Sequence, residues 1–261
     1  MNIITKACEW HEIERLVNFN IKNNKMTIDS FLEDHIVKSR HYKILSEEQI
    51  IGYFFIYDSC KLMGFYMDEY HSQYSQEVFN KVKKYEQVTH AMVATSDEYF
   101  LSHCLDNYAS ITKQAYFSIY TDKAYEKGHF HQLDFYPVLS EEDIELLNFS
   151  GDFICQDDRN KIKNQVEYYK LFIMKQEEEN IGVGVVEYGR VDTSIASVGM
   201  FVAPEFRQKG YGRSILKALQ MKVESEGYIA RSGCWYYNHN SKKSMESAGA
   251  YSKTRLLNIQ F

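Results

Sequence analysis

The residues best suited to do chemistry lie in one stretch with the sequence VGMFVAPEFRQKGYGRS. Within it, Arg207, Gly210 and Gly212 form the pattern R-x-x-G-x-G, and Lys209 and Arg213 add two further positive charges. Glycines let the backbone approach a ligand closely, and a helix that begins beside such a loop offers unpaired N–H groups with partial positive charge. The stretch therefore predicts a binding site for a phosphate group.

The elements around this loop must hold it between a strand and a helix. Apolar residues precede Pro204 almost without a break, which is typical of a strand covered on both faces, and Pro204 ends the strand because it lacks an N–H. Apolar residues then recur at helical spacing from Ile215 to Val223, and Gly227 supplies a stop. We expect a strand, a basic loop and an amphipathic helix, in that order.

This stretch resembles the acetyl-CoA pyrophosphate motif of the GNAT superfamily of N-acetyltransferases, [Q/R]-x-x-G-x-[G/A]. It does not fit a Walker loop, which needs Gly-Lys-Ser/Thr after four spacer residues, or a dinucleotide fingerprint, which needs a third glycine. Further along the chain, Asn238, Ser241 and Gly249 match a second family pattern, N-x-x-[A/S]-x7-G, at the start of the last helix.

The resemblance implies how acetyl-CoA is held. GNAT folds splay two parallel strands apart and hold the pantetheine arm between them, with backbone groups of the first strand binding its amides and polarising the acetyl carbonyl. The second strand is expected at residues 228–234. The residues that the resemblance implies for acetyl-CoA binding are Met200, Phe201, Val202, Arg207, Gln208, Lys209, Gly210, Tyr211, Gly212, Arg213, Ser214, Asn238 and Ser241.

The proton donor for the departing CoA thiolate does not follow the family pattern. Many members carry a tyrosine seven residues after the asparagine, and here that position is Met245, which cannot donate a proton. Tyr236 and Tyr237 are the alternatives that we predict, with Cys234 also close in sequence. A third alternative is that the thiolate leaves unprotonated, because a thiol with a pKa of about 8.5 is a tolerable leaving group.

A proton acceptor is also needed, because an alkylamine with a pKa of about 10 is protonated at neutral pH. Glu187, at the end of the strand beside the one that carries Met200, is the carboxylate that we predict for this role. Asp192 and Glu205 are alternatives, but Glu205 also occurs as Glu69 in the half of the chain that lacks the loop.

Composition limits the class of protein. The chain has 261 residues, 44% of them hydrophobic, and a formal net charge of −6, which gives no indication of a nucleic-acid partner. No apolar run approaches the length of about 18 residues that a membrane span needs, and no signal peptide is evident, so we expect a cytoplasmic protein without a membrane partner. The 5 cysteines are scattered, and His129 and His131 are expected at the surface, so neither a disulfide framework nor a metal is expected.

A weak internal repeat indicates two domains. The segments YKILSEEQIIGYFFIYDS and YYKLFIMKQEEENIGVGVVEYG share a strand, turn and strand plan when Gly52 is aligned with Gly182. With six extra residues in the next hairpin of the second copy, Phe65 falls on Phe201 and Tyr74 on Gly210. The first copy has therefore lost the loop glycines, and a Tyr side chain there should block a pyrophosphate.

We expect an α/β (α+β) chain of two tandem GNAT-like domains, each a mixed, mostly antiparallel twisted sheet flanked by helices. Residues 1–136 form the degenerate domain, and residues 137–261 form the acetyl-CoA-binding catalytic domain. The resemblance implies an acyltransferase that moves an acetyl group directly from acetyl-CoA to a primary amine of a small molecule, such as an antibiotic or a metabolite. A noncatalytic acyl-CoA-binding sensor or interaction module and a protein or peptide N-acetyltransferase stay open as alternatives, as does assembly as a homodimer.

Overall fold

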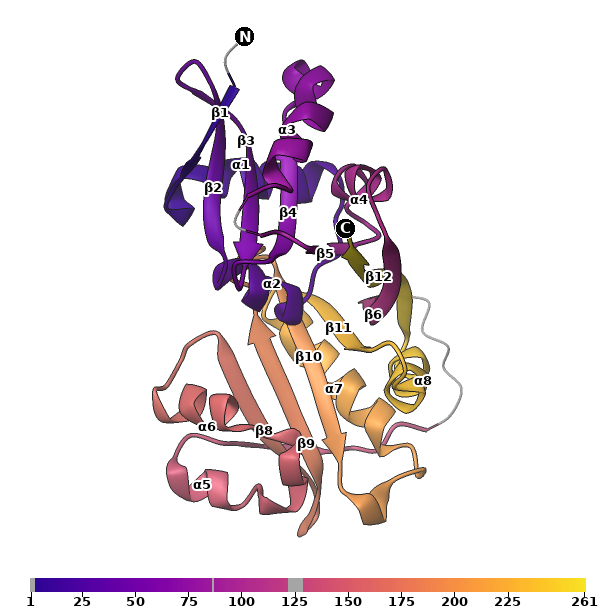
Figure 1. The fold of residues 1–261 in the computed structure, drawn as a ribbon. Coiled ribbons are helices and arrows are strands. Elements are labelled where there is room, and N and C mark those ends of the chain that lie inside the picture. Colours follow the sequence, from indigo (N-terminus) through magenta and orange to yellow (C-terminus); the bar gives the residue numbers. More distant parts are fainter. Residues whose placement is uncertain (1–2, 86, 122–128) are drawn as a thin grey trace. The chain divides into compact units, whose positions relative to one another are not determined.

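The structure is a computed structural model that describes residues 3–85, 87–121 and 129–261 (Figure 1). Its contacts group into two compact units. The first consists of Met1–Tyr116 together with Thr254–Phe261, and the second of Phe117–Lys253. The chain therefore leaves the first unit in mid-course and returns to it at the C-terminus, whereas the repeat alone suggests a single crossing between residues 136 and 137.

The first unit packs helices on a sheet with the strand order β1-β2-β3-β4-β5-β12. Helix α1 buries Ile13, Val17 and Ile21, which recur at helical spacing, and a capping box between Glu9 and Glu12 starts it. Its elements are β1 (Ile3–Ala7), α1 (Trp10–Asn23), α2 (Ser30–Val37), β2 (Arg40–Ser46), β3 (Gln49–Tyr57), β4 (Lys61–Met67), α3 (Ser75–Val82), β5 (His90–Ala94), α4 (Glu98–Leu105) and the start of β6 (Ser110–Tyr120).

The second unit has the strand order β6-β11-β10-β9-β8-β7. One apolar cluster joins α7 to the sheet, and a second cluster joins α5 and α6 to it, with Val186 in the first and Val183 in the second. Ser140 caps α5 in a capping box with Asp143. The elements are β7 (Asp134–Pro137), α5 (Glu141–Glu145), α6 (Gln156–Lys163), β8 (Tyr169–Gln176), β9 (Glu179–Tyr188), β10 (Ile195–Val202), α7 (Tyr211–Ser225), β11 (Ile229–Trp235), α8 (His239–Ser247) and β12 (Ala250–Gln260).

The last strands of the two repeats are exchanged. The C-terminal strand β12 follows α8, yet its end pairs antiparallel with β5 of the first unit, with Leu256 opposite Ala94. Strand β6 follows α4 of the first repeat, yet its end is the neighbour of β11 in the second unit. Residues 254–260 therefore complete the sheet of the first unit, and residues 117–120 extend the sheet of the second.

The internal repeat is visible in two equivalent hairpins. The β2–β3 and β8–β9 hairpins turn at Glu47 and Glu177, whose φ angles are 57° and 54°. Each hairpin also has an irregularity in register just before the turn, between Ile44 and Leu45 in one and at the equivalent place in the other. These matching details support the alignment of Gly52 with Gly182.

The continuation of this alignment is wrong by one residue. Gly52 lies opposite Met67, and Gly182 lies opposite Val202, so Phe65 corresponds to Met200 and not to Phe201. The hairpin of the second copy is thus five residues longer, and the sixth extra residue lies in the loop that follows. Since Tyr74 and Gly210 both directly precede their helices, their predicted equivalence is unaffected.

Candidate functional site

Strands β10 and β11 are parallel neighbours that separate part of the way along. They pair from Ile195 opposite Ile229 to Ser197 opposite Arg231. Both strands continue beyond this point, to Val202 and Trp235, without further pairing to each other among the described residues. The result is a pair of parallel strands that is closed at its start and open at its C-terminal end, where an extended ligand can lie between them.

The basic loop lies at the open end of this strand pair. After β10 the chain makes a short 3-10 turn, η3 (Pro204–Phe206), and then takes left-handed backbone conformations at Gln208, with φ 62°, and Gly210, with φ 89°. Gly210 is the residue directly before α7, and only glycine adopts this conformation without strain. The turn therefore directs the first N–H groups of α7 toward the loop, as an anion site requires.

The three cations of the loop are held by neighbouring groups. Arg207 donates from Nε to the carbonyl oxygen of Val202 at 3.1 Å. The Nζ atom of Lys209 lies 5.7 Å from the ring centre of Phe206. Arg213 donates from Nη2 to the carbonyl oxygen of His129 at 2.9 Å. Positive charge is thus concentrated around the start of α7.

His131 packs against the basic loop, a contact that the sequence does not predict. Its ring stacks on Tyr211 with 4.1 Å between ring centres, and its Nε2 lies 3.0 Å from the carbonyl oxygen of Lys209. Its backbone N–H donates to Ser214 Oγ at 3.0 Å. No local pattern links His131 to a loop far along the chain, so only the folded chain shows this contact.

Gly212 has a packing role in addition to its predicted place in the motif. A Cβ atom on Gly212 would lie 3.2 Å from Met200 Cε and 3.2 Å from Ser244 Oγ. The first turn of α7 therefore lies close against β10 and α8 because this residue has no side chain.

The other predicted acetyl-CoA ligands lie along the opening or at its mouth. Met200 and Val202 pack against the α7 side of the sheet, and Phe201 packs against the opposite side. Asn238 is the N-cap of α8, and its Oδ1 accepts a hydrogen bond from the Ser241 N–H at 3.1 Å. Since α8 begins just after β11, both residues lie near the open end of the strand pair.

Tyr236 and Tyr237 also lie at the open end. They directly follow β11, and their rings pack edge to face with centres 5.2 Å apart. Parallel strands end on the same side, so these tyrosines share their side with the basic loop. The predicted pyrophosphate loop is on that side, so the two tyrosines lie at the opposite end of the strand pair from the paired residues 195–197 and 229–231.

Met245 is a core residue. It is 2% exposed and belongs to the apolar cluster around α7. Burial among apolar side chains and the lack of a donor group exclude it as a proton source.

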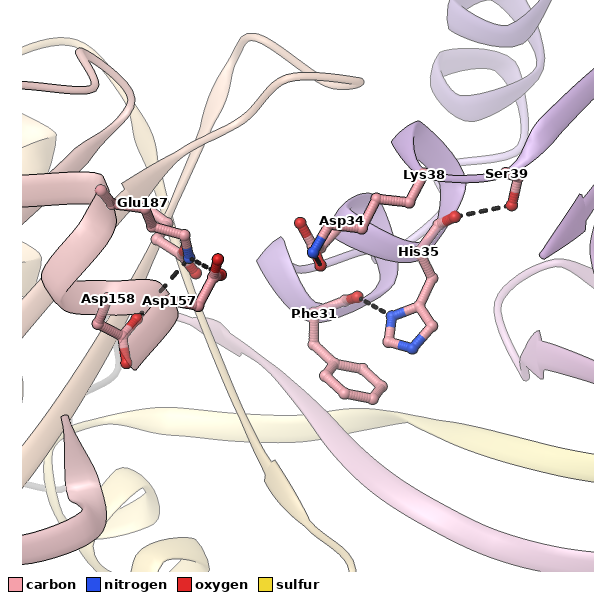
Figure 2. A network of polar contacts seen from close by, with 9 residues as sticks. Phe31, Asp34, His35, Lys38, Ser39, Asp157, Asp158 and Glu187 are labelled. Atoms are coloured by element: carbon pink, nitrogen blue, oxygen red, sulfur yellow. Dashed lines mark hydrogen bonds and ion pairs between the residues drawn. The ribbon is translucent and has the colours of Figure 1, made fainter. Parts of the chain in front are cut away.

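Glu187 lies on β9 opposite Ser197, the last residue of β10 that pairs with β11. Its Oε1 lies 3.0 Å from Lys161 Nζ, and Asp157 and Asp158 approach the same nitrogen at 3.6 Å and 3.8 Å (Figure 2). Burial lowers the pKa of Lys161, but Glu187 and the two aspartates outweigh this effect and raise it overall. The lysine is therefore charged and holds Glu187 in place.

The two alternative carboxylates have other surroundings. Asp192 accepts hydrogen bonds from the backbone and side chain of Ser194 at 3.0 Å and 2.6 Å, in the turn before β10. Glu205 is exposed in the 3-10 turn at the open end. Of the three predicted carboxylates, Glu187 is the one that lies on a strand beside the paired segment of β10 and β11.

The described ranges contain neither a candidate metal site nor a candidate membrane-spanning helix. No group of three or more His, Cys, Asp or Glu residues in them could hold a metal ion. No helix in them is long and apolar enough to cross a membrane.

The first unit repeats the strand arrangement but not the open site. Its parallel strands β4 and β5 pair over two positions, and α3 begins after Tyr74, whose φ is −99°. His103 of α4 is hydrogen-bonded through Nε2 to Ser75 Oγ at the start of α3, at 2.9 Å. The same ring packs against Phe65 and Tyr99, with centres 5.1 Å and 4.6 Å away. A protein side chain therefore already occupies the hydroxyl group at the start of α3, the place that corresponds to the start of α7 in the second unit.

Both units contain a parallel strand pair followed by a helix, and in the second unit this pair opens toward a glycine loop, which is the arrangement of a tandem GNAT fold. Two segments match family models described as "Acetyltransferase (GNAT) domain", residues 9–121 and residues 167–253. The chain belongs to the GNAT family of acetyltransferases and is an acyltransferase. The predicted family, tandem arrangement and fold class are confirmed.

Several solved structures share this fold over the whole chain. A GNAT-family acetyltransferase from Colwellia psychrerythraea superposes with a TM-score of 0.83, at 18% identity and with 100% of both chains covered. A GCN5-related N-acetyltransferase from Sphaerobacter thermophilus has a TM-score of 0.65, at 10% identity, with 99% of this chain and 95% of that chain covered. A tandem GNAT protein from the clavulanic acid biosynthesis pathway has a TM-score of 0.60, at 10% identity, with 100% and 98% covered. No curated protein matches the chain by sequence.

Proposed function

We propose that the second unit transfers an acetyl group from acetyl-CoA directly to a primary amine of a small molecule. The observation that carries this proposal is the separation of β10 from β11 after Ser197, with the basic loop at the open end. The extended pantetheine arm, with its two amides, fits between such strands as an additional strand. Its pyrophosphate then meets the first N–H groups of α7 together with Arg207, Lys209 and Arg213.

Acetyl-CoA supplies the activated acyl group, and the protein supplies positioning and charge. The amine can approach on the sheet face that carries Glu187. On this face, a Cβ atom on Gly199 would meet only Val185 within 4 Å, so the backbone of β10 is accessible beside the closed end. Glu187 and Val185 alternate on β9 opposite Ser197 and Gly199. We assign Glu187 the removal of the proton from the ammonium form of the acceptor.

We also propose that the first unit does not bind acetyl-CoA. This is supported by Tyr74 in place of Gly210 and by the His103 to Ser75 hydrogen bond at the start of α3. Residues 117–120 follow the first repeat in sequence but belong to the second unit, where β6 is the neighbour of β11.

Two further parts of the proposal concern the whole protein. We place it in the cytoplasm, which fractionation of producing cells tests. We keep a homodimer as the assembly to be tested, and light scattering at several concentrations gives the molar mass directly.

The first experiment is calorimetric titration with acetyl-CoA, followed by measurement of CoA thiol release with a panel of primary amines. Binding of one equivalent and amine-dependent release of CoA support the proposal. Two equivalents would show that the first unit also binds. No binding would refute the acetyltransferase reading. Binding without release for every amine would favour a noncatalytic acyl-CoA-binding module, the alternative to which the buried Met245 lends support.

A further inference from the structure

The closed end of the strand pair is bridged by a hydroxyl group. Ser232, the first residue of β11 beyond the paired segment, donates from Oγ to the carbonyl oxygen of Val198 at 2.9 Å. Val198 is likewise the first residue of β10 beyond the pairing. Ser232 is 1% exposed. The point from which the strands diverge is therefore marked by one buried hydroxyl.

A second hydroxyl orients the first. The phenol oxygen of Tyr120 lies 2.8 Å from Ser232 Oγ. A carbonyl oxygen can only accept, so the Ser232 proton points to Val198 and the phenol must donate to Ser232 Oγ. The hydrogen bonds therefore run in one direction, from Tyr120 to Ser232 to Val198.

Tyr120 reaches this place through the strand exchange. It is the last residue of β6, which follows the first repeat in sequence but lies beside β11 in the second unit. Its ring packs against the same apolar cluster as Met245. The phenol of Tyr120 therefore lies on the same side of the sheet as Met245, which cannot donate a proton.

We propose that the Ser232 hydroxyl, oriented by Tyr120, donates a hydrogen bond to the sulfur of the departing CoA thiolate. This inference rests on the proposed acetyl transfer. The amine nitrogen forms a bond to the acetyl carbonyl carbon, the carbon–sulfur bond breaks, and its electron pair goes to sulfur. The Ser232 proton turns from Val198 to the sulfur, and the amine proton that is lost in the reaction finally protonates the thiolate through Glu187 and solvent. No covalent intermediate and no other reactant are needed.

Tyr120 has the role of a positioning residue in this arrangement. Burial raises its pKa, and Glu224 adds to the effect, although the hydrogen bond to Ser232 acts in the opposite direction. The phenol therefore stays protonated and remains a donor, so that Ser232 Oγ always has its own proton available for a partner. Ser232 is the catalytic residue because it contacts the sulfur.

The decisive test needs no acceptor. The pKa of the CoA thiol bound to the full-length protein is measured from the ultraviolet absorbance of the thiolate across a pH series. Ser232→Ala should raise the pKa of this thiol by about one to two pH units, because a hydrogen bond to a charged group is lost. Tyr120→Phe should raise it by less, and Ser232→Thr should restore the wild-type value. With an acceptor present, Ser232→Ala should lower kcat by about tenfold to hundredfold and leave the Kd for acetyl-CoA unchanged.

Ser118→Ala is the matched control. Ser118 is also a buried residue of β6, and its hydroxyl is bonded to Ser252 Oγ of β12 at 2.9 Å. It should leave the thiol pKa and kcat unchanged. If wild type and Ser232→Ala bind CoA with the same thiol pKa, this inference is overturned while the proposed function stands. If the wild type does not bind CoA, both are overturned. Should Ser232→Ala not fold, Tyr120→Phe and Ser232→Thr carry the test.

Discussion

A comparison of two glycines at opposite ends of α7 tests whether the loop binds acetyl-CoA. Gly210 precedes the helix with φ 89°, and Gly227 follows it with φ 90°. Alanine at either position is forced into the left-handed region, at a cost of about 1–2 kcal/mol. Both variants should therefore lose similar stability, with Tm falling by about 2–4 °C for each kcal/mol in a protein of this size.

The two substitutions should differ in their effect on binding. A Cβ atom on Gly210 would lie 3.3 Å from the Nε and Nη2 atoms of Arg213, whereas one on Gly227 would have nothing within 4 Å. Relaxation at Gly210 also moves the first N–H groups of α7. Loss of one hydrogen bond to a charged phosphate costs about 1.5–3 kcal/mol, so Gly210→Ala should weaken acetyl-CoA binding by about tenfold to hundredfold.

Calorimetry and thermal unfolding of both variants give the Kd and the Tm that this comparison needs. The expected result is an equal loss of Tm with weaker binding in Gly210→Ala only. An unchanged Kd in Gly210→Ala would refute the assignment of the loop. An equal loss of affinity in Gly227→Ala would show that general strain, and not the loop, is responsible.

Three further predictions concern other parts of the chain. Deletion of Thr254–Phe261 removes the antiparallel partner of β5 with the buried apolar side chains of Leu256 and Ile259, each worth about 2–5 kcal/mol, and should expose the first unit to limited proteolysis. Burial raises the pKa of Asp97 to about 7. The folded protein therefore binds this proton more tightly than the unfolded chain does, so the free energy of unfolding should fall by about 1.4 kcal/mol per pH unit as the pH rises from about 4 to 7. Asp97→Asn keeps an N-cap but cannot titrate, so denaturant titrations of this variant should not show that fall. Glu187→Gln should lower kcat without changing the Kd for acetyl-CoA. Asp157→Asn makes the same charge change beside Lys161 and should leave kcat unchanged.

Each of these predictions has a clear contrary result. Unchanged protease resistance after the deletion would mean that β12 is dispensable for the first unit. An identical pH dependence of stability in wild type and Asp97→Asn would place the pKa of Asp97 near its ordinary value. Equal kcat losses in Glu187→Gln and Asp157→Asn would indicate a general effect of charge and not proton transfer at Glu187.

The features that the sequence predicted well are local. The strand before Pro204, the loop around Gly210 and the helix that ends before Gly227 depend on residues close together in the chain, where apolar spacing and glycine and proline chemistry act directly. The two hairpins could be aligned for the same reason, because the turns at Glu47 and Glu177 impose the same backbone conformation. Where the loop lengths differed, the alignment slipped by one residue, since sequence alone does not show which side of a loop carries an insertion.

The folded chain alone shows which distant segments meet. The exchange of β6 and β12 cannot be predicted from the sequence of either strand, because a strand has the same alternating pattern whichever neighbour it pairs with. The contact of His131 with Tyr211 and the hydrogen bond from Tyr120 to Ser232 join segments far apart in sequence. A lone histidine or tyrosine has no periodicity that points to its partner. Its contacts are therefore set by the pairing of strands and the packing of α7 on the sheet, which exist only once the chain has folded.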